Sequence, residues 1–162
     1  MDFDGAMGKD GADIGIWIRS PAFQPDKVPS NVRVCSYKLA FDCSNNEAEY
    51  EALIAGLKIL KKLNAKRILV YGYSELVIKH VKGEYQEKHP WMRAYRNAVQ
   101  DILRMFSDYT LIAVPRTQNI IADSIAIATR NLKIPMNSNN KFEIHVKHWL
   151  AIPDNLRYWQ VF

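Results

Sequence analysis

Ser44–Leu60, SNNEAEYEALIAGLKIL, is the stretch of this sequence that decides the fold. Ser44 and Glu47 fit a capping box, in which each side chain accepts the backbone N–H of the other at the start of a helix. Apolar residues then recur at helical spacing: Ala48, Ala52, Leu53, Ala55, Leu57, Ile59 and Leu60. So wide an apolar stripe predicts a helix that lies against a sheet.

Three β-strands are predicted before this helix. They lie in MDFDG, ADIGIWIRS and VRVCSYKLAF, and the second and third alternate with the period of two that is typical of strands. Between these two, SPAFQPDKVPSN holds three prolines and predicts a loop. Three strands that follow one another without a helix predict an antiparallel meander.

Strands and helices alternate after this helix. The sequence predicts a strand in KRILVYG, helices in SELVIKHVKG and HPWMRAYRNAVQDILRMF, a strand in YTLIAVP and a helix in NIIADSIAIATRN. Strands that are separated by helices must cross over in parallel, so the order predicts a mixed sheet with helices on its faces. From Leu132 the pattern weakens to turn-forming residues and one possible strand.

The composition fits one globular domain of 162 residues, 48% of them apolar and 24% charged. No apolar run is long enough to span a membrane and no signal peptide follows Met1, so we expect an intracellular protein of the cytoplasm or nucleus. Cys35 and Cys43 could pair, but we expect them to be reduced there, because a core of this size needs no disulfide. The formal net charge of +5 fits simple solubility, and it is also the sign expected of a protein that meets phosphate backbones.

Three acidic residues lie where predicted elements begin or end. Asp4 is in the first strand, Glu49 is in the first turns of the first helix, and Asp123 is early in the last helix. A central strand and two helix starts can converge on one rim of a mixed sheet. Carboxylates persist together only around divalent cations, because like charges repel. Oxygen ligands alone favour Mg²⁺ or Mn²⁺.

Four sequence segments, in this order along the chain, resemble the ribonuclease H type 1 domain of plant gypsy-type LTR retrotransposon polyproteins. They are DFDGA, SYKLAFDCSNNEAEYEALIAGLKI, AKRILVYGYSELVIKHVKGEY and VPRTQNIIADSIA. The resemblance implies an α/β ribonuclease H-like fold, a mixed five-stranded sheet of order 3-2-1-4-5 with strands 1–3 antiparallel and helices on both faces. It places this domain in residues 1–131. Residues 146–162, VKHWLAIPDNLRYWQVF, resemble the connector that precedes integrase, so residues 132–162 are interpreted as a C-terminal connector. Adjoining reverse transcriptase and integrase are expected partners.

The resemblance can be carried over residue by residue to the four metal-binding carboxylates of the family. Asp4 matches the first, Glu49 the second and Asp123 the fourth. The third belongs in a Y-G-D-S word after the fourth strand. In this sequence that word is YGYS, Tyr71–Ser74, so Tyr73 stands where the family has its third aspartate.

The resemblance implies endonucleolytic cleavage of the RNA strand of RNA–DNA hybrids by two-metal-ion hydrolysis with Mg²⁺ or Mn²⁺. A phenol stays protonated at pH 7 and is a poor ligand for such ions, so Tyr73 should weaken the second metal site. We therefore expect an impaired enzyme. The alternative is a ribonuclease H-like module without catalysis, which binds nucleic acid or serves as a scaffold.

Further residues fall where the family or their charge indicates nucleic-acid contacts: Asn45, Asn46, Ser74, Lys79, Arg93 and Arg116. The asparagines either cap the helix or contact the RNA minor groove, and the two roles are compatible. The serine caps the next helix, which is the favoured interpretation, or contacts a DNA phosphate. Lys79 and Arg93 belong, together with His80 and other basic residues, to a stretch that is either a solvated helix face or a surface for the DNA backbone.

Overall fold

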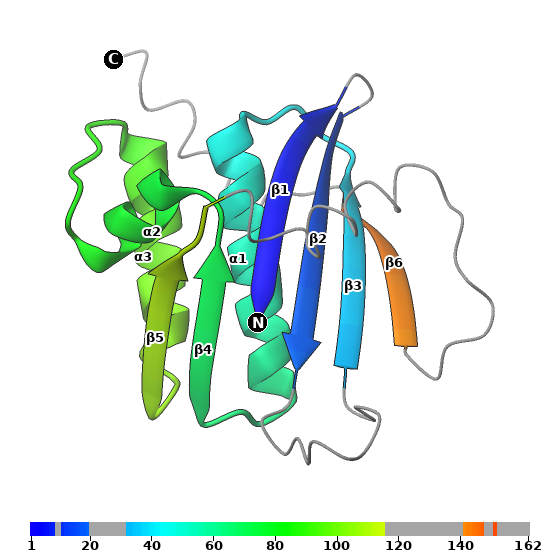
Figure 1. Cartoon of the computed structure of the whole chain (residues 1–162). Coiled ribbons are helices and arrows are strands. Elements are labelled where there is room, and N and C mark those ends of the chain that lie inside the picture. The colour runs from blue at the N-terminus through cyan, green and yellow to red at the C-terminus, as the bar shows by residue number, and fades with distance from the viewer. Residues whose placement is uncertain (9–10, 20–31, 116–140, 148–150, 152–162) are drawn as a thin grey trace.

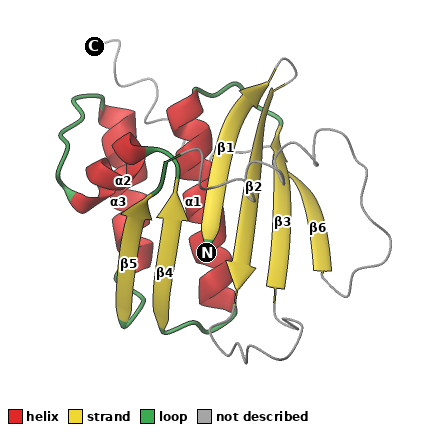
Figure 2. Ribbon diagram, viewed as in Figure 1, coloured by secondary structure: helices red, strands yellow, loops and turns green. Residues whose placement is uncertain are grey.

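The computed structural model describes residues 1–8, 11–19, 32–115, 141–147 and 151. Within these residues, six strands form one sheet and three helices lie on one of its faces (Figure 1, Figure 2). The fourth predicted helix, in 119–131, lies outside the described residues. Across the described ranges, no helix is long and apolar enough to cross a bilayer.

The strand order of the sheet is β5-β4-β1-β2-β3-β6. The strands are β1 (Asp2–Gly8), β2 (Gly11–Arg19), β3 (Val32–Leu39), β4 (Arg67–Gly72), β5 (Asp108–Ala113) and β6 (Lys141–Lys147). The first three are antiparallel neighbours, and β4 runs parallel to both β1 and β5. The predicted order 3-2-1-4-5 is confirmed, with one strand added beside β3.

The added strand β6 comes from the segment that was interpreted as a C-terminal connector. It pairs in parallel with β3 over its full length, from Arg33 opposite Lys141 to Leu39 opposite Lys147. At least this part of the segment therefore continues the sheet, and the boundary at residue 131 stays a prediction.

Helix α1 (Asn45–Lys62) begins with the predicted capping box, which is confirmed. The Ser44 N–H donates to Glu47 Oε2 at 2.6 Å, and the Glu47 N–H donates to Ser44 Oγ at 3.3 Å. The apolar stripe of α1 is buried against the sheet, and Leu53 and Leu57 are fully buried. The stripe predicted from the sequence is thus the face that forms the core.

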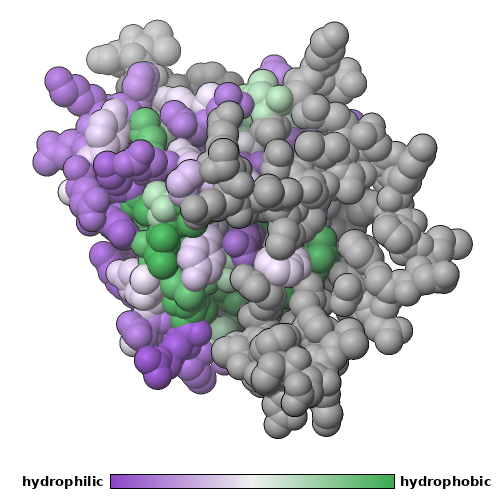
Figure 3. Space-filling model, viewed as in Figure 1, coloured by the Kyte–Doolittle hydropathy of each residue, from purple (hydrophilic) through white to green (hydrophobic). Residues whose placement is uncertain are grey.

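Helices α2 (Glu75–Lys82) and α3 (Pro90–Leu103) complete the helical layer beside α1. Ser74 caps α2, because its Oγ accepts the Val77 N–H at 3.2 Å. The opposite face of the sheet carries apolar side chains over β4 and β5 (Figure 3), where Leu69 and Ile112 are 42% and 37% exposed. The resemblance predicts helices on both faces, and among the described residues the helices cover one face.

A buried polar network joins α1, α3 and the tail. Glu51 is fully buried, and its Oε1 accepts both the Tyr95 hydroxyl and the Ala151 backbone N–H at 2.7 Å each. The ring of Tyr95 stacks on that of Tyr50, with centroids 5.3 Å apart. One carboxylate therefore holds residue 151 against two helices of the domain.

We expect Glu51→Leu to lower the free energy of unfolding by about 2–4 kcal/mol, because two buried donors lose their acceptor. Glu51→Gln keeps an acceptor oxygen at the same place and should cost about 1 kcal/mol. Denaturant unfolding of both variants measures the difference. Equal losses in the two variants would contradict this account, since they would make the charge, and not the acceptor oxygen, the source of the stability.

Candidate active site

Asp4 and Glu49 are brought together by a close approach of helix α1 to the central strand β1. A Cβ atom added at Gly5 would lie 2.4 Å from the carbonyl carbon of Ala48 and 2.7 Å from the backbone nitrogen of Glu49. No side chain fits in that space, so only glycine at position 5 permits this helix–strand distance. The residue before Gly5 is Asp4, so the backbone positions of Asp4 and Glu49 lie close together on adjacent elements.

Tyr73 lies at the same level of the neighbouring strand. Phe3 of β1 pairs with Gly72, the last residue of β4, so the next residues along the two chains are Asp4 and Tyr73. A Cβ atom at Gly72 would lie 2.5 Å from the Phe3 ring, so this end of β4 also approaches its neighbour closely. The backbone thus brings three of the four predicted metal-binding positions to one place.

Two acidic residues are buried in this part of the structure, which is unusual for a protein interior. Asp4 and Glu49 are only 7% and 6% exposed, and Tyr73 is half-buried. Buried carboxylates that lie close together repel, and a hard divalent cation is the partner that compensates them best. The two acids fit Mg²⁺ or Mn²⁺ as ligands, whereas the phenol at the third position does not.

The fourth predicted ligand, Asp123, and the predicted contact residue Arg116 lie outside the described residues. Within the described part of the chain, no group of three or more histidine, cysteine or acidic residues could hold a metal ion. Of the four positions that the resemblance predicts as metal ligands, this part holds Asp4, Glu49 and Tyr73. The metal site accordingly stays a prediction that depends on Asp123.

The two asparagines lie at the start of α1, at the end of the sheet that carries the acids. The helix cap is Ser44, so the interpretation of Asn45 as a cap is wrong: Asn45 Oδ1 instead accepts the Met7 N–H of β1 at 3.2 Å. The reason is the capping box, which already satisfies the first turn. Asn45 is exposed and Asn46 half-buried, and their contact with RNA stays a prediction.

The basic stretch on α2 and α3 divides into exposed and buried members. Lys79 is exposed and pairs with Glu75 at 2.6 Å, a hydrogen bond that raises the pKa of the lysine. Arg93 is exposed on α3. Both side chains can therefore reach a nucleic-acid backbone, and the capping role favoured for Ser74 is confirmed.

His80, which the sequence groups with these cations, is fully buried, so it does not belong to the basic surface. Its Nδ1 lies 2.6 Å from the Tyr50 hydroxyl. Burial, assisted by the charge of Arg96, lowers the pKa of His80, and burial raises the pKa of Tyr50. One hydrogen bond therefore joins a protonated phenol and a neutral ring, and this buried pair is part of the core.

Comparison with known proteins places this geometry in a family. Residues 2–129 match the family described as reverse transcriptase-like. Ribonuclease HI of Halobacterium salinarum is 36% identical over 83 residues, which cover 51% of this chain and 42% of that protein. A bifunctional protein of Mycobacterium tuberculosis is 36% identical over the same length, which covers 23% of it. This chain thus matches less than half the length of these curated relatives.

Solved structures agree with the strand order. The crystal structure of RNase H1 from Halobacterium salinarum superposes with a TM-score of 0.67 and 29% identity, covering 80% of this chain and 95% of that one. The N-terminal RNase H domain of the Mycobacterium tuberculosis protein superposes with a TM-score of 0.64 and 28% identity, covering 78% and 97%.

Proposed function

From the premise that this chain belongs to the reverse transcriptase-like family and has a ribonuclease H-like domain, we propose that it binds RNA–DNA hybrids. We further propose that it is an impaired endonuclease for the RNA strand of these hybrids. The observation that supports the proposal is the close approach of the backbone at Asp4, Glu49 and Tyr73, which lie on adjacent elements. Two of these positions keep the acids that hydrolysis requires, and the third has lost its acid.

In this proposal Asp4, Glu49 and Asp123 would hold Mg²⁺ or Mn²⁺. Two such ions, when bound, supply Lewis acidity on both sides of a scissile phosphate. Asp4 lies on the central strand and would be shared between both ion positions, whereas Glu49 would serve one of them. Tyr73 adds bulk and a neutral hydroxyl at the second position, so the protein there retains only Asp4 and Glu49 as acidic ligands.

A second candidate function is a nucleic-acid-binding or scaffold module without catalysis. The observation that favours it is the same Tyr73, because binding through Lys79 and Arg93 requires no metal ligand. The two functions differ in one measurement. The direct test is cleavage of an RNA–DNA hybrid in Mg²⁺ and in Mn²⁺ by the protein and by its Tyr73→Asp variant: restored cleavage supports the impaired enzyme.

We infer an origin in a plant gypsy-type LTR retrotransposon from the resemblance of the four sequence segments alone. The domain would then occupy residues 1–131 of this chain and the connector 132–162, between a reverse transcriptase and an integrase of one polyprotein. Such a protein would act in the cytoplasm or nucleus. Recovery of the flanking coding sequence tests this origin, and flanks without reverse transcriptase or integrase would contradict it.

Binding to a hybrid should weaken as salt rises, because contacts of Lys79 and Arg93 with phosphates release counterions. We expect Lys79→Gln and Arg93→Gln each to lower the slope of log affinity against log salt by about one. Fluorescence anisotropy with a labelled hybrid measures this. Lys38→Gln is the matched control, since it removes one exposed positive charge from β3 instead of the helices. Tight binding that ignores salt would contradict the backbone contacts.

A further inference from the structure

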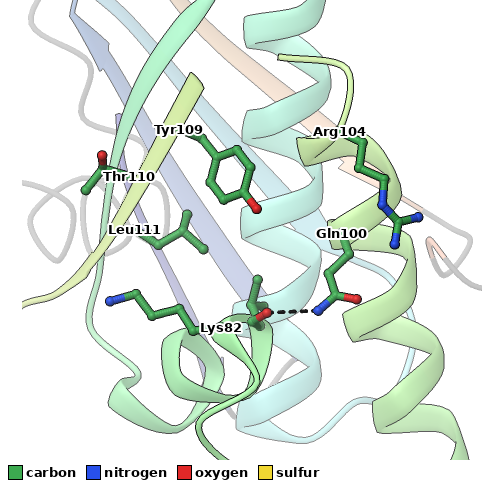
Figure 4. A pocket seen from close by; sticks show the side chains of 7 residues that line it. Lys82, Gln100, Arg104, Tyr109, Thr110 and Leu111 are labelled. Atoms are coloured by element: carbon green, nitrogen blue, oxygen red, sulfur yellow. Dashed lines mark hydrogen bonds between the residues drawn. The ribbon is translucent and has the colours of Figure 1, made fainter. Parts of the chain in front are cut away.

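A cavity of about 500 Å³ lies between the end of α2, the second half of α3 and strand β5 (Figure 4). Its β5 residues Tyr109 and Leu111 pair with Ile68 and Val70 of β4. These partners lie three to five residues before Tyr73, which is about 10–16 Å along a strand. The cavity is therefore separate from the place where the acids meet, and the proposed function assigns nothing to it.

The walls of the cavity are held by packed elements. The side-chain nitrogen Nε2 of Gln100 on α3 donates to the Val81 carbonyl at the end of α2 at 3.0 Å, which ties the two helices across the opening (Figure 4). Val81 and Leu111 are buried and form an apolar floor. A preformed site of this kind loses little entropy when a ligand binds.

The charged and aromatic side chains of the cavity suit an extended anion that also carries planar rings. Lys82 and Arg104 are exposed cations that lie on opposite sides of the Tyr109 ring (Figure 4). The ring itself is 46% exposed. None of the lining residues in the described part of the chain is acidic. A single phosphate would need the two cations to converge, whereas these two flank an aromatic surface.

The carboxylates near the cavity form exposed ion pairs, one of them with Arg104 itself. Asp101 pairs with Arg104 at 2.7 Å, and Asp108 pairs with Arg67 at 3.8 Å, all with strongly exposed side chains. An exposed ion pair contributes little to stability, so Arg104 can exchange its carboxylate for a phosphate at low cost.

We propose that this cavity is an accessory binding site for a short segment of single-stranded DNA or RNA. Phosphates of the strand bind Lys82 and Arg104, and one base stacks on Tyr109. Cationic grooves that carry an aromatic platform bind single strands in this way, with little dependence on sequence. The site needs neither a metal ion nor the acids at Asp4 and Glu49, so it goes beyond the proposed cleavage of hybrids.

The test is fluorescence anisotropy with a short labelled oligothymidylate at low salt in the presence of EDTA. Tyr109→Leu should weaken binding about tenfold, the size of one lost base–aromatic stack, and Tyr109→Phe should leave it unchanged. Lys82→Gln and Arg104→Gln should each lower the salt slope by about 0.7. The control Lys38→Gln removes the same charge away from the cavity and should have little effect.

Three results would overturn this site. They are unchanged binding by Tyr109→Leu, an equal loss in Lys38→Gln and Lys82→Gln, and competition by a polyglutamate peptide as strong as that by unlabelled oligothymidylate. Because EDTA is present and no hybrid is used, a failure of Tyr73→Asp to cleave hybrids leaves the accessory site standing. Conversely, a result that overturns the accessory site does not affect the proposed cleavage of hybrids, which is tested by the separate cleavage assay.

Discussion

Tyr73→Asp is expected to raise the rate of RNA cleavage in an RNA–DNA hybrid from near background by at least about a hundredfold. Partners outside the first ligand shell of a metal are worth about 10–100-fold in affinity or activity, and a direct ligand is worth at least as much. The gain should appear in kcat, because a ligand that stabilises the leaving oxygen acts mainly in the transition state. Single-turnover cleavage in Mg²⁺ and in Mn²⁺ measures it.

Three controls make this result specific. Tyr73→Phe should cleave no better than the unaltered chain, because the hydroxyl has no role in this account. Tyr73→Ala removes the bulk without adding a ligand, and so separates relief of crowding from gain of a carboxylate. Adding Asp4→Asn to Tyr73→Asp should abolish the gain. A protein that cleaves hybrids well as it stands, and loses this activity in Tyr73→Phe, would show that the tyrosine has gained a catalytic role.

Gly5→Ala should lower the free energy of unfolding by about 3 kcal/mol or more, the upper end of the cost of overpacking a rigid interior. The added methyl group would meet the backbone of Ala48 and Glu49, which cannot rotate away as a flexible side chain can. In a chain of 162 residues this corresponds to a fall of about 6–12 °C in Tm, measured by thermal unfolding.

Gly83→Ala is the matched control for Gly5→Ala. Gly83 has a φ of 80° and nothing within 4 Å of an added Cβ, so alanine there meets only backbone strain, at a cost of about 1–2 kcal/mol. A Gly5→Ala variant as stable as Gly83→Ala would mean that α1 yields easily. In the Tyr73→Asp background Gly5→Ala should also remove the restored cleavage, since it moves Glu49 away from Asp4.

Local signals in the sequence predicted the elements, and the resemblance predicted their order in the sheet. The capping box of Ser44 and Glu47 depends on residues three apart, so it can be read directly from the chain. The strand order 3-2-1-4-5 came from the resemblance to the family, since local patterns indicate parallel crossovers without fixing which strands are neighbours. The same segments predicted a metal site at Asp4, Glu49 and Tyr73, which lie on adjacent elements, and that site stays a prediction.

The sequence did not show which distant residues are partners in the fold. β6 was only a possible strand, because nothing in its own seven residues indicates that β3 is its neighbour. His80 was grouped with surface cations, because its partner Tyr50 lies thirty residues earlier. Glu51 is an acid beside an apolar stripe, and its donors lie on α3 and the tail. The close approach of α1 to β1 did have a signal in the sequence, because Gly5 is a glycine directly after a predicted metal ligand.

The pairing of β6 with β3 has a consequence for synthesis of the chain. The paired residues of the two strands are more than one hundred residues apart, and the ends of the hydrogen bond from Ala151 to Glu51 are 100 residues apart. At about 5–20 residues per second, the ribosome needs about 5–20 seconds to add the missing partner after β3 has emerged. During this interval the outer edge of β3 is an open template for pairing with other nascent chains, and the charges of Arg33 and Lys38 on that strand oppose such pairing.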